Sequence, residues 1–153
     1  MKKNFIKNNI RPFYLLIVLL LISANISKAQ TPEEKIIAKE KALLDRWKQG
    51  DTFGFIEAAD TGITYFDPTL AERIDGIEKF RNYLSSFNGT FSFPSYELIN
   101  PKVQMNGDIG VLTFNFVGHL NNKKTDGWNA TEVYKLLNND WKIISSHWSH
   151  TKP

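Results

Sequence analysis

Residues 96–149 read YELINPKVQMNGDIGVLTFNFVGHLNNKKTDGWNATEVYKLLNNDWKIISSHWS. Apolar and polar residues alternate in four runs of this segment, which is the period of a β-strand: 96–105, 109–120, 128–137 and 141–149. The runs are separated by Asn106-Gly107, by the polar residues 121–127 and by Asn138-Asn139-Asp140. Asn-Gly favours a tight hairpin because both residues tolerate a positive φ, and short connections require antiparallel neighbours. The segment therefore predicts a four-stranded antiparallel meander.

Pro101 falls inside the first of these strands. Proline has no N–H to donate to a neighbouring strand, so within sheets it is confined to edge strands and bulges. We therefore expect the strand at 96–105 to be bulged or to lie at an edge of the sheet.

The residues before this segment have helical periodicity. Thr31-Pro32-Glu33-Glu34 is typical of a helix start, because threonine caps, proline suits the first helical position and Glu34 completes a capping box. The apolar residues of this helix follow at helical spacing: Ile36, Leu43, Leu44 and Trp47. Gly50 is the predicted stop.

Two shorter helices and a strand are predicted next. Asp51 is placed to cap a helix that carries Phe53 and Ile56, and residues 63–66 form a short strand that ends at Asp67-Pro68. Asp75 is placed to cap a third helix, whose apolar stripe is Ile77, Phe80, Leu84 and Phe87. Helices first and an antiparallel sheet second predict an α+β fold, with the helices on one face of the sheet. A curved sheet crossed by the long first helix would enclose a cavity, where ligands usually bind.

Residues 1–29 have the pattern of a secretory signal peptide. A positive head (Lys2, Lys3, Lys7, Arg11) precedes a ten-residue apolar run at 13–22, and Ser27-Lys28-Ala29 offers small residues for cleavage. The run is shorter than the ~20 residues of a membrane-spanning helix, although an uncleaved anchor is the alternative. We therefore expect a mature domain at 30–153 that is secreted or periplasmic and free of the membrane after cleavage.

The composition excludes several classes of protein. The chain has 153 residues, 42% of them apolar, and no cysteine, so disulfides, thiolate metal sites and cysteine nucleophiles are excluded. Five of its 19 basic residues and none of its 16 acidic residues lie in 1–29. The mature chain thus keeps 14 basic and 16 acidic residues, and nothing in it resembles a nucleic-acid-binding surface.

Several short motifs carry a resemblance to a known superfamily. They are, in order, Gly50-Asp51, Ile63-Thr64-Tyr65-Phe66-Asp67-Pro68, Asp75-Gly76 and Trp141-Lys142-Ile143-Ile144. The chain resembles the nuclear transport factor 2-like superfamily, which includes ketosteroid isomerases, SnoaL-like cyclases and the association domain of calcium/calmodulin-dependent protein kinase II. Leu98-Ile99-Asn100-Pro101, Gly107-Asp108, Thr131 and Val133 are similar to the association domain in particular. The resemblance implies a cone-shaped curved sheet with the helices on its concave face.

The resemblance also suggests a catalytic candidate. Asp67 matches the position of the general base in ketosteroid isomerases, and partial burial at a cavity rim would raise its pKa. An ordinary Asp-Pro turn is the alternative. Leu43 stands where those isomerases carry a tyrosine that donates to the developing enolate, and leucine has no hydrogen bond to donate. This substitution argues against isomerase activity.

The same resemblance predicts which strand residues face the cavity. Val117, Glu132 and Trp148 align with cavity arginines of the association domain, and none of them is basic, so an acidic ligand is not expected. The predicted cavity-facing residues are Asn115, His119, Glu132 and Trp148. We expect a neutral or amphipathic small molecule that stacks on Trp128 or Trp148 and is held by Glu132 or His119. The candidate ligand-binding residues are Tyr65, Asn115, Trp128 and Trp148.

His119 and Glu132 form the second catalytic candidate, as an acid–base pair. A buried hydrogen-bonded pair with no chemical role is the alternative. His147 and His150 are three residues apart in a predicted strand and so point to opposite faces; we expect no metal and no cofactor.

Three functions are compatible with these features: an exported binding domain for a small molecule, a proton-transfer enzyme that uses Asp67 or His119 with Glu132, and an assembly module. If Asn115 and His119 face the cavity, the outer face of the sheet carries the apolar residues Phe114, Phe116 and Val133. A monomer would rarely expose such a face. We therefore expect a homodimer.

Overall fold

The computed structural model describes residues 29–121 and 123–151. The predicted signal peptide, apart from Ala29, lies outside these residues. Within them, no helix combines the length and the apolar character needed to cross a membrane.

The first described helix, α2 (Pro32–Trp47), begins as predicted. Thr31 Oγ1 accepts a 3.2 Å hydrogen bond from the Glu34 N–H, and Glu34 Oε2 accepts a 2.8 Å bond from the Thr31 N–H. These two bonds complete the capping box, with Pro32 in the first turn. The buried residues of the helix are Ile36, Glu40, Leu43 and Leu44, so a carboxylate lies within the predicted apolar stripe.

Four short elements follow: α3 (Phe53–Ala58), β1 (Ala59–Phe66), β2 (Ile74–Asp75) and α4 (Ile77–Ser85). Thr52 rather than the predicted Asp51 is the N-cap residue of α3, and its side chain makes no capping bond. Asp51 Oδ1 instead accepts a 3.0 Å bond from the Phe53 N–H at the start of this helix. The predicted cap at Asp75 is wrong. Asp75 pairs with Arg73 at 2.6 Å, and α4 begins after Gly76, whose φ of 86° lies in the left-handed region that favours glycine.

The second half of the chain forms the predicted meander: β3 (Ser95–Asn106), β4 (Ile109–Leu120), β5 (Lys123–Leu137) and β6 (Asp140–His150). The sheet order is β2-β1-β6-β5-β4-β3, and all neighbours are antiparallel except β1 and β6. The polar residues 121–127 are mostly strand rather than loop, because β5 begins at Lys123 and pairs with the end of β4. Asn121, with a φ of 51°, allows this tighter turn.

Both predictions made from Pro101 are confirmed. Strand β3 lies at the edge of the sheet, and its register with β4 shifts between Ile99 and Lys102. Asn100 has a φ of 50° at this bulge. The missing N–H of Pro101 therefore falls where the ladder is interrupted.

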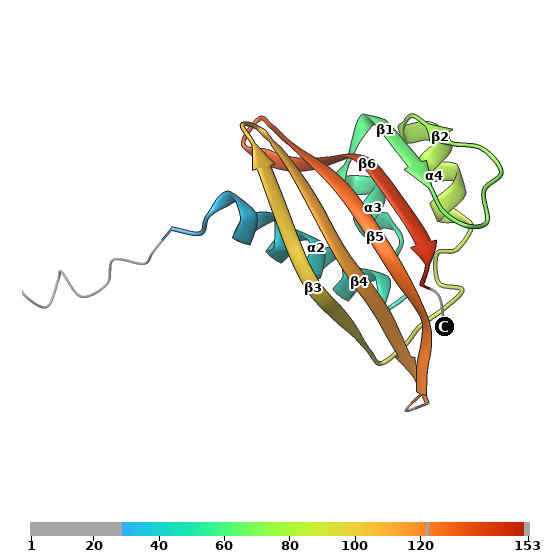
Figure 1. Cartoon of the computed structure of the whole chain (residues 1–153). Helices are drawn as coiled ribbons and strands as arrows, with labels where there is room; N and C mark the ends of the chain where they lie inside the picture. Colours follow the sequence, from blue (N-terminus) through green and yellow to red (C-terminus); the bar gives the residue numbers. More distant parts are fainter. Residues whose placement is uncertain (1–28, 122, 152–153) are drawn as a thin grey trace, which may run out of the picture.

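The helices cover one face of the curved sheet, and α2 runs across β3, β4 and β5 (Figure 1). The strand residues that face these helices are buried, among them Leu112, Phe114, Phe116, Ala130, Tyr134 and Ile143. Gly110 brings helix and sheet together, because a Cβ there would overlap Cδ1 of Ile36 on α2. The fold is α+β, as the sequence predicts.

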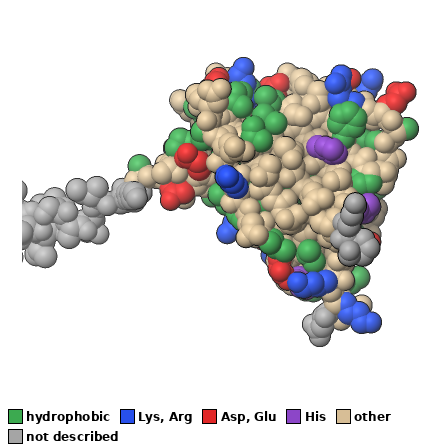
Figure 2. Space-filling model, in the orientation of Figure 1, with side chains coloured by type: hydrophobic (Ala, Val, Ile, Leu, Met, Phe, Trp, Pro, Cys, Tyr) green, Lys and Arg blue, Asp and Glu red, His purple; other side chains and the backbone are tan. Residues whose placement is uncertain are grey.

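The opposite, outer face of the sheet carries small polar and β-branched residues: Val111, Thr113, Asn115, Val117, Asn129, Thr131, Val133, Ser145 and His147. The prediction that Phe114 and Phe116 lie on this face is wrong. Both are buried on the helix-covered side, where their apolar area is removed from water, and Asn115 points outward instead. Figure 2 views the outer face, with charged side chains gathered toward its edges.

Candidate functional site

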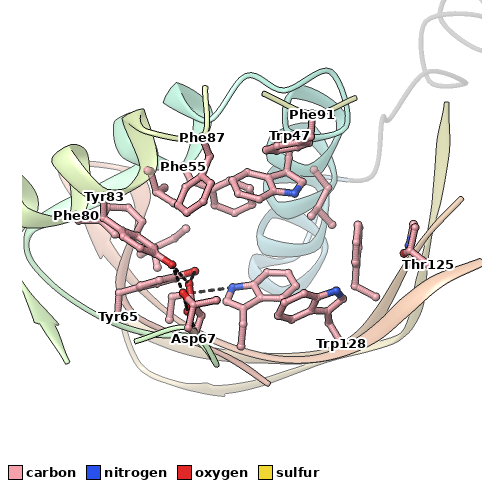
Figure 3. A pocket seen from close by; sticks show the side chains of 18 of the residues that line it. Trp47, Phe55, Tyr65, Asp67, Phe80, Tyr83, Phe87, Phe91, Thr125 and Trp128 are labelled. Atoms are coloured by element: carbon pink, nitrogen blue, oxygen red, sulfur yellow. Dashed lines mark hydrogen bonds between the residues drawn. The ribbon is translucent and has the colours of Figure 1, made fainter. Parts of the chain in front are cut away.

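A cavity of about 320 Å³ lies between the helices and the concave face of the sheet. Its lining is Leu44, Trp47, Phe55, Tyr65, Asp67, Thr69, Phe80, Tyr83, Leu84, Phe87, Phe91, Phe93, Phe116, Gly118, Thr125, Trp128, Ile143, Ser146 and Trp148. Aromatic side chains dominate this list, and they come from every layer around the cavity (Figure 3). The volume is at the lower end of the range of about 300–1,000 Å³ found for small-molecule pockets.

The floor of the cavity follows from the register of the central strands. Phe116 on β4 pairs with Trp128 on β5, and Trp148 on β6 pairs with Ala130. Because side chains two apart in a strand share a face, these three rings lie together on the concave side. The Trp128 and Trp148 rings are 6.5 Å apart at 72°, and the Phe116 and Trp148 rings are 6.1 Å apart at 83°. These planes form the walls of a box rather than a parallel stack.

The roof comes from the helices and from the segment after α4. Trp47 on α2 lies 5.7 Å from Phe55 on α3 and 4.8 Å from Phe91, measured between ring centroids. The sequence places Trp47 in the apolar stripe of the first helix and does not single out Phe55 or Phe91. The cavity also takes Phe80 and Phe87 from the predicted stripe of α4, and that stripe gives no signal that a pocket lies beneath it.

Asp67 forms the polar end of the cavity, directly after β1. Its Oδ1 accepts bonds from the N–H and the hydroxyl of Thr69 at 2.8 and 2.7 Å, the geometry of an Asx turn before Pro68. Its Oδ2 accepts bonds from the hydroxyls of Tyr65 at 3.0 Å and Tyr83 at 2.5 Å. A carboxylate has about four lone-pair positions, and four donors lie within hydrogen-bond distance of this one. The hydroxyls of Thr69 and Tyr83 also lie 2.7 Å apart, so their two protons are shared among three contacts.

These bonds overturn the predicted raised pKa of Asp67. Partial burial raises the pKa, but the hydrogen bonds from Tyr83, Thr69 and Tyr65 outweigh it and hold the pKa below its usual value. Burial and the bond to Asp67 in turn raise the pKa of Tyr83 to about 12, and burial raises the pKa of Tyr65 as well. The end of the cavity therefore holds one ionised carboxylate and two protonated tyrosines near neutral pH.

Glu132 lies on the concave side but beneath the floor, with no exposed surface. Its Oε1 accepts bonds from the Ser146 hydroxyl at 2.9 Å and from the Trp148 indole N–H at 3.1 Å. Ser146 and Trp148 line the cavity, whereas Glu132 does not. Burial, and then the charge of Glu40, raises the pKa of Glu132 well above its usual value. Glu132 therefore orients two lining groups from behind.

Glu40 is a buried residue that the sequence prediction missed. Its Oε2 accepts a 2.5 Å bond from the Tyr134 hydroxyl, and burial raises its pKa to about 7 although this bond acts in the opposite direction. Its position four residues after Ile36 and three before Leu43, within an apolar stripe, is the signal that could have revealed it.

The predicted pair of His119 and Glu132 is wrong. His119 Nε2 lies 2.8 Å from Glu97 Oε1 on the outer side of the sheet, while Glu132 is buried on the concave side. Asn115 also lies on the outer face, where its side-chain amide bonds Asn129 at 2.7 Å. The predictions for His119 and Asn115 failed for one reason, because both placed the outward-facing side chains of β4 on the concave side of the sheet. Tyr65, Trp128 and Trp148 do line the cavity, so the structure brings together three of the four predicted ligand-binding residues.

Within residues 29–121 and 123–151, no group of three or more carboxylates or histidines is placed to bind a metal ion.

Residues 33–152 match the family model of the calcium/calmodulin dependent protein kinase II association domain. The chain belongs to this family. Its fold is nuclear transport factor 2-like, and no curated protein matches the sequence.

Solved structures extend the comparison. A candidate ketosteroid isomerase from Parabacteroides distasonis is 38% identical, with 84% of this chain and 95% of that chain covered and a TM-score of 0.74. A nuclear transport factor 2-like protein of unknown function from Pseudomonas putida is 20% identical, with coverages of 79% and 87% and a TM-score of 0.69. The association domain of the C. elegans kinase is 22% identical, with coverages of 74% and 92% and a TM-score of 0.61. The last two similarities concern the fold alone.

Proposed function

We propose that this domain binds a small neutral or amphipathic molecule in the aromatic cavity. The observation that carries the proposal is the lining itself, in which aromatic rings surround about 320 Å³ and Asp67 forms a polar end with the hydroxyls of Tyr65, Thr69 and Tyr83. An apolar ring buried there gains about 25 cal/mol per Å² of area removed from water. A polar substituent near Asp67 would fix its orientation.

The proposal is tested by the binding of N-phenyl-1-naphthylamine, a neutral fluorescent probe. Phe87 and Phe53 are matched for this test. Phe87 follows α4 and is 37% exposed, and Phe53 begins α3 and is 38% exposed. Of the two, Phe87 lines the cavity and Phe53 does not. We expect Phe87→Ala to weaken binding by about three- to tenfold through lost contact area, and Phe53→Ala to leave it unchanged. Absence of saturable binding, or equal effects of the two substitutions, would contradict the proposal.

Proton-transfer catalysis finds less support in the same geometry. Asp67 already accepts hydrogen bonds from its neighbours and its pKa is lowered, so it is a weak general base. His119 lies on the other side of the sheet, bonded to Glu97. Burial raises the pKa of Glu132, but this residue does not line the cavity and acts on it only through Ser146 and Trp148.

We also propose that two copies of the chain pair through the outer face of the sheet. The face offers valine, threonine, asparagine and serine side chains, and charge is sparse at its centre (Figure 2). Depletion of charge is typical of interface cores. Val133→Glu should therefore convert a dimer to a monomer in size exclusion with light scattering, whereas Asn82→Glu on the exposed side of α4 should not. A wild-type monomer at micromolar concentration would refute the pairing.

Export by residues 1–29 is a further part of the proposal, supported by their sequence pattern. Sequencing the N-terminus of the protein from fractionated cells tests it. We expect a chain that begins at Gln30 in the secreted or periplasmic fraction, and a retained N-terminus in the cytoplasmic fraction would oppose it.

A further inference from the structure

The charge of the cavity is unbalanced. Among the described residues that line it, Asp67 is the only side chain that is charged at neutral pH, and no lysine, arginine or histidine is among them. The ion pairs formed by the described residues do not involve Asp67 either. A carboxylate that faces an apolar cavity without a cation leaves a negative potential there, which attracts a positive ligand.

The hydrogen bonds of Asp67 restrict the kind of cation. The N–H and the hydroxyl of Thr69 lie at Oδ1, and the hydroxyls of Tyr65 and Tyr83 lie at Oδ2, so an incoming N–H group would have to compete with donors already in place. Attraction by charge alone needs no lone pair. The arrangement thus favours a cation without strong donors over an ammonium or a guanidinium that must form hydrogen bonds.

The walls of the cavity suit the same kind of cation. The rings of Phe116, Trp128 and Trp148 stand at 72° and 83° to one another, so ring planes bound the volume in more than one direction. On the other side, Tyr65 lies 5.1 Å from Phe80 and 5.8 Å from Tyr83 between ring centroids. A cation over an aromatic face is attracted by the negative face of the ring, and quaternary ammonium groups are typical ligands of such aromatic cages.

The cost of desolvation points the same way. A primary ammonium is a compact and strongly hydrated charge, and its transfer to an apolar cavity leaves donors unpaired. Alkyl groups on the nitrogen spread the charge over a larger surface and replace the donors with apolar area, which the aromatic lining can bury.

We propose that the occupant of this cavity is an organic monocation, with an alkylated ammonium held near Asp67 and an apolar or aromatic body against Trp128 and Trp148. This inference rests on the proposed binding function and specifies the class of ligand. Asp67 acts in it as a binding residue through its charge, and Tyr65 and Tyr83 hold the carboxylate in place.

The test is a series of ligands that share one ring and differ in charge. The probes are (2-naphthylmethyl)trimethylammonium, 2-naphthylmethylammonium, 2-naphthalenemethanol and 2-naphthoate, titrated into the wild-type protein by calorimetry. We expect the trimethylammonium compound to bind about tenfold or more tightly than the alcohol, and the carboxylate to bind most weakly. We also expect the primary ammonium to bind more weakly than the trimethylammonium.

The outcomes separate this inference from the proposed function. If the alcohol binds as tightly as the trimethylammonium compound, the cation inference is overturned while the binding function stands. Tighter binding of the primary ammonium overturns the alkylated part of the inference. If none of the four probes binds, both proposals fail.

A pair of variants locates the charge. Asp67→Asn should lower the affinity for the trimethylammonium compound by about tenfold and leave the affinity for the alcohol nearly unchanged. Asp108→Asn, an exposed aspartate in the turn between β3 and β4, serves as the control and should change neither. Equal losses for the cation and the alcohol in Asp67→Asn would overturn the role of its charge. If that variant does not fold, the ligand series on the wild-type protein still decides the question.

Discussion

The hydroxyl of Tyr134 on β5 donates a 2.5 Å hydrogen bond to Oε2 of Glu40 on α2, and neither side chain has exposed surface. This bond joins the long helix to the centre of the sheet. Glu132, on the same strand, contributes a second buried carboxyl, and the charge of Glu40 helps to raise its pKa. Among the described residues, Glu40 Oε1 and Glu132 Oε2 have no hydrogen-bond partner. The interior of the domain thus contains a pair of acids that favours the protonated state.

The first prediction concerns the pH dependence of stability. The pKa of Glu40 rises from 4.5 to about 7 on folding, so the folded state binds more protons than the unfolded state between these values. The contribution is complete below pH 4.5 and is lost as the pH rises through about 7. At about 1.4 kcal/mol per pKa unit, the free energy of unfolding should fall by roughly 3 kcal/mol from this group. Denaturant unfolding between about pH 5 and pH 9 measures it.

Glu132→Gln supplies the control for that prediction. The amide oxygen can still accept from Ser146 and Trp148, and the amide nitrogen adds a donor that carries no charge. We expect the free energy of unfolding of this variant to depend less on pH than that of the wild type, because the substitution removes a buried carboxyl whose pKa is raised. A variant curve parallel to that of the wild type would contradict the account of the acid pair.

The second prediction isolates the Tyr134 hydroxyl. Tyr134→Phe leaves the Glu40 carboxyl without a donor in a buried site, so the free energy of unfolding should fall by about 1–3 kcal/mol at neutral pH. The loss should be smaller near pH 5, where Glu40 is protonated. Tyr96→Phe is the matched control, because its exposed 3.2 Å bond to the Lys41 carbonyl should contribute under about 0.5 kcal/mol. Equal losses in the two variants would be inconsistent with a special role for Tyr134.

The third prediction concerns the contact between α2 and β4. A Cβ at Gly110 would overlap Cδ1 of the fully buried Ile36 and lie 3.0 Å from Sδ of Met105. Gly110→Ala should therefore destabilise the fold by about 1–3 kcal/mol through overpacking. Gly62→Ala on β1, where the new Cβ meets Asp60 Oδ2 at 3.4 Å, should be tolerated. Thermal unfolding compares the two, and a neutral Gly110→Ala would show that the helix can move away from the sheet.

The local elements of this fold could be predicted from the sequence because their causes are local. The capping box of Thr31 and Glu34 uses residues three apart, and strand alternation depends on a period of two. Pro101 predicted the bulged edge strand because the missing N–H of proline is likewise a local property. The start of β5 at Lys123 could not be predicted, because it depends on pairing of a polar segment with the end of β4.

The direction in which a strand faces is not a local property. Alternation separates Phe114 and Phe116 from Asn115 and His119, but it does not say which set meets the helices. The alignment with association-domain arginines put Asn115 and His119 inside, whereas burial of apolar area puts the phenylalanines there. Hydrophobicity was the better guide on this strand.

The cavity could be predicted only in part. Tyr65, Trp128 and Trp148 were identified, since they lie in or beside recognisable strands. Trp47 and Phe91, which contribute to the roof, come from segments more than forty residues apart and are brought together by folding. The direction of the pKa shift of Asp67 was predicted wrongly because the prediction considered burial and not the hydrogen-bond donors. The Tyr83 hydroxyl comes from a distant helix, and Thr69 donates only because of the local turn.

The final prediction tests the state of Asp67 in the absence of any ligand. Its folded pKa is lowered, so the unfolded chain binds more protons in the acid range and this carboxylate stabilises the fold above its unfolded pKa. That contribution is lost as the pH falls through the folded pKa. The difference in Tm between the wild type and Asp67→Asn should therefore be largest near neutral pH and shrink below about pH 4, since asparagine cannot be protonated there. Subtraction of the two curves removes the opposite dependence that Glu40 imposes on both proteins. A difference that stays constant with pH would show that Asp67 contributes only the shape of its turn, and the charge assigned to the end of the cavity would then be wrong.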